Sequence, residues 1–125
     1  MAFQPISTKT FDLTGDNAVR AGCDEEYVFT VADANGPINI SEYTARCEFR
    51  TPGAGGTTTG CPQPTMSILN GGTGGEILME LPNAQTTGKS ASGRYDIELV
   101  HTGTSKVTRP FSGAFNMVAE VTTGS

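Results

Sequence analysis

Few side chains in this sequence are suited to proton transfer, nucleophilic attack or metal binding. The chain of 125 residues holds one histidine and three cysteines. His101 is the only conventional general base, and it precedes the loop-like stretch Thr-Gly-Thr-Ser. The spacing implies no neighbouring carboxylate or nucleophile, so we expect His101 to be a surface residue at the end of a strand. The Gly-x-Ser-x-Gly, His-Glu-x-x-His and phosphate-loop motifs do not occur. The sequence therefore predicts no enzyme and no catalytic residues.

Two acidic stretches are candidates for metal binding. Asp24-Glu25-Glu26 is a short acidic run, and Asp33-Ala-Asn35-Gly36 resembles half of a calcium loop. A calcium site needs about six to eight converging oxygens, and one such fragment does not provide them. A hairpin turn explains Asp-Ala-Asn-Gly fully, because Asn and Gly accept positive φ. Neither Cys-x-x-Cys nor a zinc-like Cys/His spacing occurs. We expect no metal and no cofactor.

The three cysteines have different surroundings in the sequence. Cys47 lies between Ala45 and Phe49 on the apolar side of an alternating run, so we expect a small buried thiol. Cys23 and Cys61 lie in turn-like segments, and we expect both to be exposed. They either bond to each other or to neighbouring subunits, or are free surface thiols of a protein made in a reducing cytoplasm.

Composition and charge restrict the class of protein. The net charge is −5, and 36% of the residues are hydrophobic, which is enough for one compact core. Eight scattered basic residues form no patch that neutralises phosphates, so we expect no nucleic-acid partner. No apolar run approaches the roughly 20 residues of a membrane helix, so we expect no membrane partner. The opening MAFQPISTKT lacks the basic and apolar regions of a signal peptide.

The apolar residues alternate with polar ones at period two. In Tyr43–Arg50, Tyr43, Ala45, Cys47 and Phe49 share one face, and charged residues and a threonine share the other. Residues 93–101 repeat the pattern, and Glu76–Leu81 follows it except at Leu78. Such runs are typical of half-buried strands in an antiparallel sheet, and no amphipathic helical stretch is present.

Turn residues divide the rest of the chain into further short strands, expected at 8–13, 27–33, 66–69, 106–111 and 114–121. Pro110 marks its run as an edge strand or a bulge, and the glycine-rich residues 71–75 are expected to form a flexible hairpin tip. About seven to eight short strands indicate an all-β fold, either a β-sandwich or a small barrel, and we expect the antiparallel β-sandwich because it is the commoner outcome. The residues expected in its core are Phe29, Val31, Tyr43, Cys47, Phe49, Ile77, Met79, Leu81, Tyr95, Ile97, Leu99, Phe115 and Met117.

The segments outside these strands suggest the domain organisation. We expect residues 22–122 to form the sandwich, residues 123–125 a tail, and residues 1–21 either its first strand or an arm that orders on a neighbour. Residues 51–64 (TPGAGGTTTGCPQP) carry no charge, and we expect an irregular loop there. We expect residues 82–92 to be irregular as well.

The order of these segments resembles a known family. The stretch Tyr27-Val-Phe-Thr-Val-Ala-Asp-Ala-Asn-Gly-Pro-Ile-Asn-Ile-Ser-Glu-Tyr-Thr-Ala45 is similar to the opening of small immunoglobulin-like structural proteins of tailed bacteriophages. Residues 75–82, 93–99 and 109–122 are similar to the closing half of these proteins, whose plan is that of the N-terminal domain of the phage baseplate upper protein family. The resemblance covers roughly residues 22–122. It implies an immunoglobulin-like sandwich in a virion protein, and it brings no catalytic residues.

The resemblance leads to a functional hypothesis. We expect a structural component of the virion: a head decoration (cement) protein, a neck component, or a tail or baseplate subunit. Its partners would be major capsid, neck or tail subunits and copies of itself. Residues that could contact other subunits are Thr57, Thr58, Thr59, Cys61, Pro62, Phe3 and Phe11. The alternative is an immunoglobulin-like adhesion module that binds host surface glycans.

Overall fold

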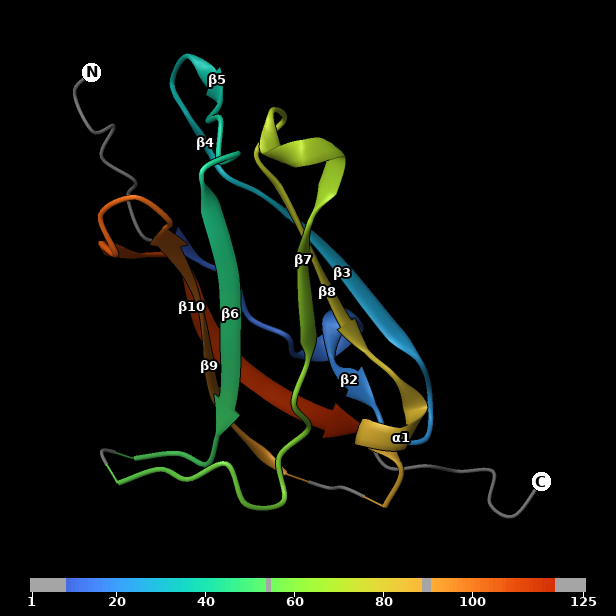
Figure 1. Cartoon of the computed structure of the whole chain (residues 1–125). Coiled ribbons are helices and arrows are strands. Elements are labelled where there is room, and N and C mark those ends of the chain that lie inside the picture. The colour runs from blue at the N-terminus through green and yellow to red at the C-terminus, as the bar shows by residue number, and fades with distance from the viewer. Residues whose placement is uncertain (1–8, 54, 89–90, 119–125) are drawn as a thin grey trace.

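Two β-sheets face each other in the computed structural model, which describes residues 9–53, 55–88 and 91–118 (Figure 1). The strands are β1 (Lys9–Thr10), β2 (Val19–Arg20), β3 (Glu25–Thr30), β4 (Ala32–Asp33), β5 (Gly36–Pro37), β6 (Tyr43–Arg50), β7 (Thr65–Ile68), β8 (Glu76–Leu81), β9 (Ser92–His101) and β10 (Val107–Val118). The helices are the 3-10 turns η1 (Gly15–Asn17) and η2 (Leu69–Gly72) and the single-turn α1 (Asn83–Thr86). This confirms the prediction of an all-β sandwich, whereas the immunoglobulin-like strand order stays a prediction.

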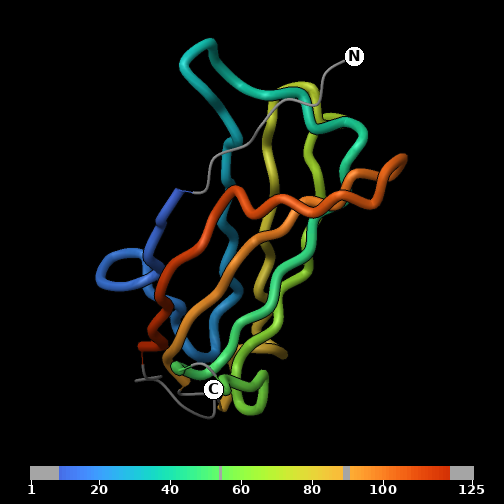
Figure 2. Tube along the Cα trace, turned by 90° about the vertical axis from the view of Figure 1, so that its left-hand side faces the viewer, coloured from blue at the N-terminus to red at the C-terminus, as the bar shows by residue number. Residues whose placement is uncertain are grey.

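The large sheet has the order β1-β10-β9-β6, and β2 also pairs with β10. The small sheet has the order β3-β8-β7, and β4 and β5 form a separate hairpin that projects from one end (Figures 1 and 2). The β4–β5 turn confirms the hairpin expected at residues 34–36. The pairs β6–β9, β9–β10, β3–β8 and β7–β8 are all antiparallel.

The core lies between the two sheets. Alternate residues of β8 and β9 are buried: Ile77, Met79 and Leu81 from β8, and Tyr95, Ile97 and Leu99 from β9. The other residues expected in the core are also buried, namely Phe29, Val31, Phe49, Phe115 and Met117. Tyr43 and Cys47 differ from the expectation, since they are half-buried and only border the core. Within the described residues β6 pairs only with β9 and is an edge strand of the large sheet, so no second strand of that sheet flanks Tyr43 and Cys47.

The last strand is longer than the sequence indicated. The two runs expected at 106–111 and 114–121 are one strand, β10, with a register irregularity between Thr108 and Phe111. Pro110 lies inside this irregularity, which confirms the bulge; because β10 pairs with β9 on one side and with β1 and β2 on the other, it is not an edge strand. Proline has no backbone N–H to donate to a neighbouring strand, and a bulge leaves one residue outside the hydrogen-bonded ladder, so proline is tolerated there.

The N-terminal segment completes the large sheet. β1 and β2 both run parallel to β10, with Lys9 opposite Phe111 and Val19 opposite Met117. Leu13 and Val19 are fully buried, so residues 9–21 belong to the sandwich, whereas residues 1–8, with Phe3, lie outside the described part. The backbone approaches closely at Gly113, where a Cβ atom would lie 2.1 Å from the Phe11 carbonyl oxygen. Only glycine permits this contact without displacement of the segment.

Two connections differ from the sequence-based expectation. Residues 82–92 contain α1, whose first N–H, from Asn83, donates to Asp24 Oδ1 at 2.6 Å. The glycine-rich tip at 71–75 is packed against the chain, because the carbonyls of Gly72 and Gly75 accept the N–H groups of Ile40 and Val31 at 2.8 Å each. Both features depend on residues distant in sequence. Within the described ranges, no helix has the length and apolarity needed to cross a bilayer.

Candidate functional site

The free edge of β3 is the strongest candidate for a binding site. Within the described part of the chain, β3 pairs with β8 only, so its other side has no strand partner. An unpaired edge presents a row of backbone N–H and C=O groups to any extended chain that comes alongside it. The adjoining element is the N-terminal segment, whose Phe11 ring lies edge-on to Phe29 at 5.6 Å.

A mainly apolar hollow of about 380 Å³ lies beside this edge, and we call it the β3 groove. Phe11 and Val28 are 41% and 54% exposed there, and the Phe29 and Phe111 rings lie 5.0 Å apart. The groove is lined by Phe11, Glu26, Tyr27, Val28, Phe29, Thr30 and Phe111. A free strand edge beside an aromatic hollow combines the two parts of strand addition, backbone pairing and pockets for alternate side chains.

Two tyrosine hydroxyls hold the N-terminal wall of the groove. Tyr95 donates a hydrogen bond to the carbonyl oxygen of Phe11, and Tyr27 donates one to that of Asn17 at 3.0 Å. Burial, together with the nearby Glu25 carboxylate, raises the pKa of Tyr27 to about 12. Burial likewise raises the pKa of Tyr95. Both hydroxyls therefore stay protonated donors at neutral pH.

His101 lies at the start of the β9–β10 hairpin, where it stabilises a turn. Its Nδ1 accepts the backbone N–H groups of Gly103 and Thr104 at 3.2 Å each. Nε2 lies 3.4 Å from Glu42 Oε2, and the ring is edge-on to Tyr43 at 5.1 Å. These contacts hold the imidazole in place and give it a structural role in the hairpin.

The loop at 51–64 has one exposed part and one buried part. Thr57, Thr58 and Thr59 are exposed, as a contact with another subunit requires. Cys61 and Pro62 are buried, so the expectation that Cys61 is exposed is wrong. The cause is tertiary: Cys61 joins the core cluster, where neighbouring apolar side chains cover it.

The cysteines are not joined in disulfides in this structure. Cys23 is exposed and Cys61 is 3% exposed, and neither forms a disulfide. Burial raises the pKa of the half-buried Cys47 thiol, with smaller contributions from the nearby carboxylates Asp96, Glu48 and Glu98. Cys47 is therefore a poor nucleophile at neutral pH.

Asp33 and Glu25, one from each acidic stretch, have structural partners. Asp33 Oδ1 accepts the N–H of Asn35 at 2.8 Å within the β4–β5 turn. Glu25 is buried and accepts hydrogen bonds from the Arg20 side chain, the shorter at 2.8 Å. Among the residues that the structure describes, no group of three or more His, Cys, Asp or Glu side chains converges on a common point.

Sequence reasoning included Phe11 among the contact residues but missed Tyr27, Val28 and Phe111. A signal was present at Val28, an apolar residue on the polar side of the β3 alternation between Glu26 and Thr30. The alternation alone does not reveal that β3 is an edge strand. In sequence comparisons, no protein-family model and no curated protein matches this chain.

Proposed function

We propose that this protein is a structural subunit of a tailed-phage virion that acts through contacts with other proteins. The observation that carries the proposal is the edge of β3 that no described strand pairs with, beside the aromatic β3 groove. An edge of this kind gains affinity from backbone hydrogen bonds, and the groove adds burial of one or two apolar side chains. The segment similarity to phage immunoglobulin-like proteins supports the virion as the setting.

The symmetry of a virion suits such a site. Each copy needs only a small interface, because many copies on one particle multiply weak contacts into high occupancy. The partners in this proposal are capsid, neck or tail subunits and further copies of the chain. Glycan binding has weaker support, since Phe11 is the only exposed aromatic ring in the described residues and sugar stacking favours a broader aromatic platform.

The test begins with purified particles. Quantitative mass spectrometry and antibody labelling should find the protein in many copies at one fixed position, and its absence from particles would refute the proposal. A second arm uses Phe11→Gln, with Val107→Gln as the matched control, because the two side chains are 41% and 47% exposed.

The two variants should separate the groove from general surface effects. Val107 lies at the start of β10, outside the lining of the groove, so Val107→Gln should be incorporated like the wild type. Phe11→Gln should be incorporated at least about tenfold less, because it removes the exposed apolar wall. Circular dichroism shows whether both variants are folded. Equal incorporation of two folded variants would show that the β3 groove is not the contact.

A further inference from the structure

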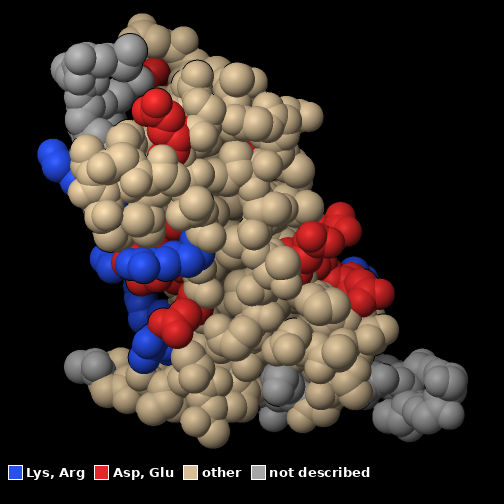
Figure 3. All heavy atoms as spheres, in the orientation of Figure 1, with Lys and Arg blue, Asp and Glu red and all other residues tan. Residues whose placement is uncertain are grey.

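The outer faces of the two sheets differ in charge. The outward residues of the small sheet include Glu26, Glu76 and Glu80, and β3, β7 and β8 contain no lysine or arginine. The outer face of the large sheet carries the arginines Arg46, Arg50, Arg94 and Arg109 together with Glu48, Asp96 and Glu98. Figure 3 shows these two charged regions on opposite sides of the molecule.

Three carboxylates on the acidic face have no ion-pair partner in the part of the chain that the structure describes. Glu26 and Glu80 lie directly opposite each other in the β3–β8 register, an arrangement of like charges that destabilises a strand pair. Neither of them, nor Glu76, has an ion-pair partner among the described residues. Two residues further along the strands, on the same outer face, Val28 lies opposite Leu78 and adds apolar surface between this pair and Glu76.

Most charges on the arginine face are already paired. Arg46 contacts Glu98 at 2.7 Å, and Arg109 contacts Asp96 and Glu98 at 3.0 and 3.1 Å. Burial alone would raise the pKa of Glu98, but the hydrogen bonds from the two arginines outweigh it and lower that pKa. These pairs form a fixed network at the centre of the face.

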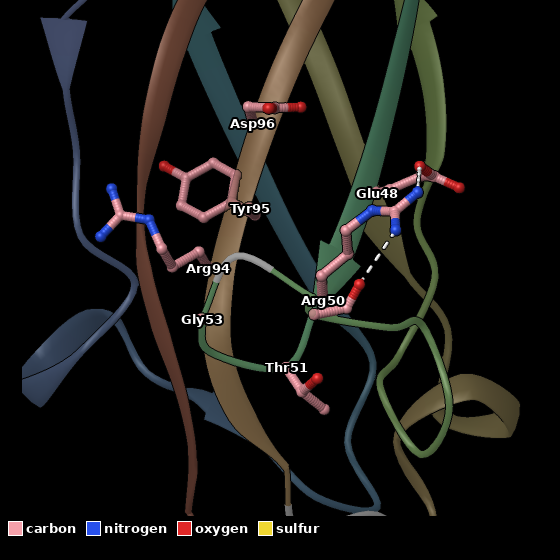
Figure 4. Close-up of a pocket in the computed structure, with 8 residues that line it drawn as sticks. Glu48, Arg50, Thr51, Gly53, Arg94, Tyr95 and Asp96 are labelled. Atoms are coloured by element: carbon pink, nitrogen blue, oxygen red, sulfur yellow. Dashed lines mark hydrogen bonds and ion pairs between the residues drawn. The ribbon is translucent and has the colours of Figure 1, made fainter.

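Arg94 lies outside this network. It is exposed, lies opposite Arg50 in the β6–β9 register, and has no ion pair within the described residues. Arg50 turns to Glu48 at 2.7 Å, and Figure 4 shows the Arg94 side chain extending in the other direction. Both arginines line a hollow of about 380 Å³ between the sheet and the backbone at Thr51 and Gly53. Within the described ranges, this end of the face therefore holds a guanidinium without an ion pair beside an open depression.

We propose that the acidic face of one copy stacks on the arginine face of a second copy, with Arg94 seated between Glu26 and Glu80. Two carboxylates on opposed residues of neighbouring strands are close enough for one planar guanidinium to bridge, and the contact relieves their mutual repulsion. A second copy is the occupant because the two complementary surfaces belong to the same chain. Since the faces differ, the contact is head-to-tail, and its repetition generates a ring or a filament.

The stacking makes a second copy of the chain one of the partners in the proposed assembly role, and its biological meaning rests on that role. The association itself can be measured on the purified protein alone. Exposed ion pairs are individually weak because water screens them, so the contact is weak and depends on high local concentration. Sedimentation velocity of purified protein at low salt should show association that increases with concentration. About 0.3 M salt should suppress it, because exposed charges are then screened.

Charge reversal identifies the faces. Glu26→Lys and Arg94→Glu should each weaken association at least about tenfold, because a repulsion replaces an attraction. An equimolar mixture of the two variants should restore association. In a mixed contact, either the reversed charge at position 26 of one variant meets the reversed charge at position 94 of the other, or both positions are unchanged, so the charges are opposite in each case. Asp16→Lys and Lys9→Glu are the controls: they make the same changes in net charge at exposed residues outside both faces and should associate like the wild type.

Three outcomes would overturn the stacking contact. They are a wild-type protein that stays monomeric at about 1 mM in low salt, reversals no more disruptive than their controls, and a mixture of folded variants that fails to associate. These outcomes differ from failure of the proposed function, because the virion experiment with Phe11→Gln is read on particles and uses a residue outside both faces.

Discussion

Removal of the Tyr95 hydroxyl tests whether the N-terminal segment is attached to the sandwich as the structure indicates. Tyr95 is 3% exposed, its ring stacks on Phe49 with centroids 5.4 Å apart, and its hydroxyl donates to the Phe11 carbonyl. Tyr95→Phe keeps the ring and removes only the donor. Tyr27→Phe is a matched control, because its hydroxyl donates to another carbonyl of the same segment, that of Asn17, but in an exposed position.

The expected magnitudes follow from the surroundings of the two carbonyls. A neutral hydrogen bond contributes about 0.5–1.5 kcal/mol net, and a shielded acceptor left without a donor costs about 1–3 kcal/mol. The Phe11 carbonyl is part-buried and packed against Gly113, so Tyr95→Phe should lower the free energy of unfolding by about 2 kcal/mol. In Tyr27→Phe, water hydrogen-bonds to the exposed Asn17 carbonyl in place of the lost hydroxyl, so this variant should lower the free energy of unfolding by only about 0.5 kcal/mol.

Denaturant unfolding measures both losses, and amide hydrogen exchange locates them. The N–H groups of Phe11 and Leu13 donate to Ser112 and Ala114 on β10 at 2.9 and 2.8 Å. Their exchange should accelerate in Tyr95→Phe more than that of the Met79 amide on β8. A loss no larger than that of Tyr27→Phe, or unchanged exchange at Phe11 and Leu13, would refute this reasoning.

The same hydroxyls predict how stability depends on alkaline pH. Burial raises the pKa of Tyr27 to about 12 and also raises that of Tyr95, whereas both have ordinary values near 10 in the unfolded chain. The unfolded state therefore loses these protons first, so their stabilising contribution is full below about pH 10 and is lost as the pH rises through the folded-state values. Tyr95→Phe should flatten the decline measured by unfolding at increasing pH.

Three further predictions concern the core, the thiols and a close backbone contact. Phe49→Ala should lower the free energy of unfolding by about 3–5 kcal/mol in denaturant titration, because Phe49 is fully buried and its ring lies 4.8 Å from that of Phe115. A thiol reagent should modify Cys23 rapidly in the folded protein, whereas Cys61 should react only at the rate of opening or unfolding, as peptide mass spectrometry would show. Gly93→Ala should cost about 1–3 kcal/mol in thermal unfolding, because its Cβ would lie 2.0 Å from the Arg50 carbonyl oxygen.

The alternating strands were the most predictable part of the fold. The strand expected at Tyr43–Arg50 has the same bounds in the structure, and so does that at Glu76–Leu81. Successive side chains of an extended strand point to opposite faces, so alternating polar and apolar residues predict a strand from a few neighbouring residues alone. The short strand β2 was missed because its two residues, Val19 and Arg20, are too few to show a period.

The candidate site was less predictable, because it depends on which strands meet. Phe11 was singled out as a contact residue, but its place beside Phe29 arises from the parallel pairing of the N-terminal segment with β10. Cys61 lies in a loop that looks exposed in sequence, yet it is buried where that loop folds back on the core. No pattern within a few residues encodes either contact.

The sequence by itself determined an all-β chain with few reactive groups, because period-two alternation and turn residues act over short distances. The tertiary structure alone decided that β3 has an edge without a strand partner among the described residues, that β10 accommodates Pro110 inside a sheet, and that Glu26, Glu80 and Arg94 lie on opposite faces. The physical reason is that edges, bulges and charged faces are properties of strand pairs, whose members are tens of residues apart in the chain.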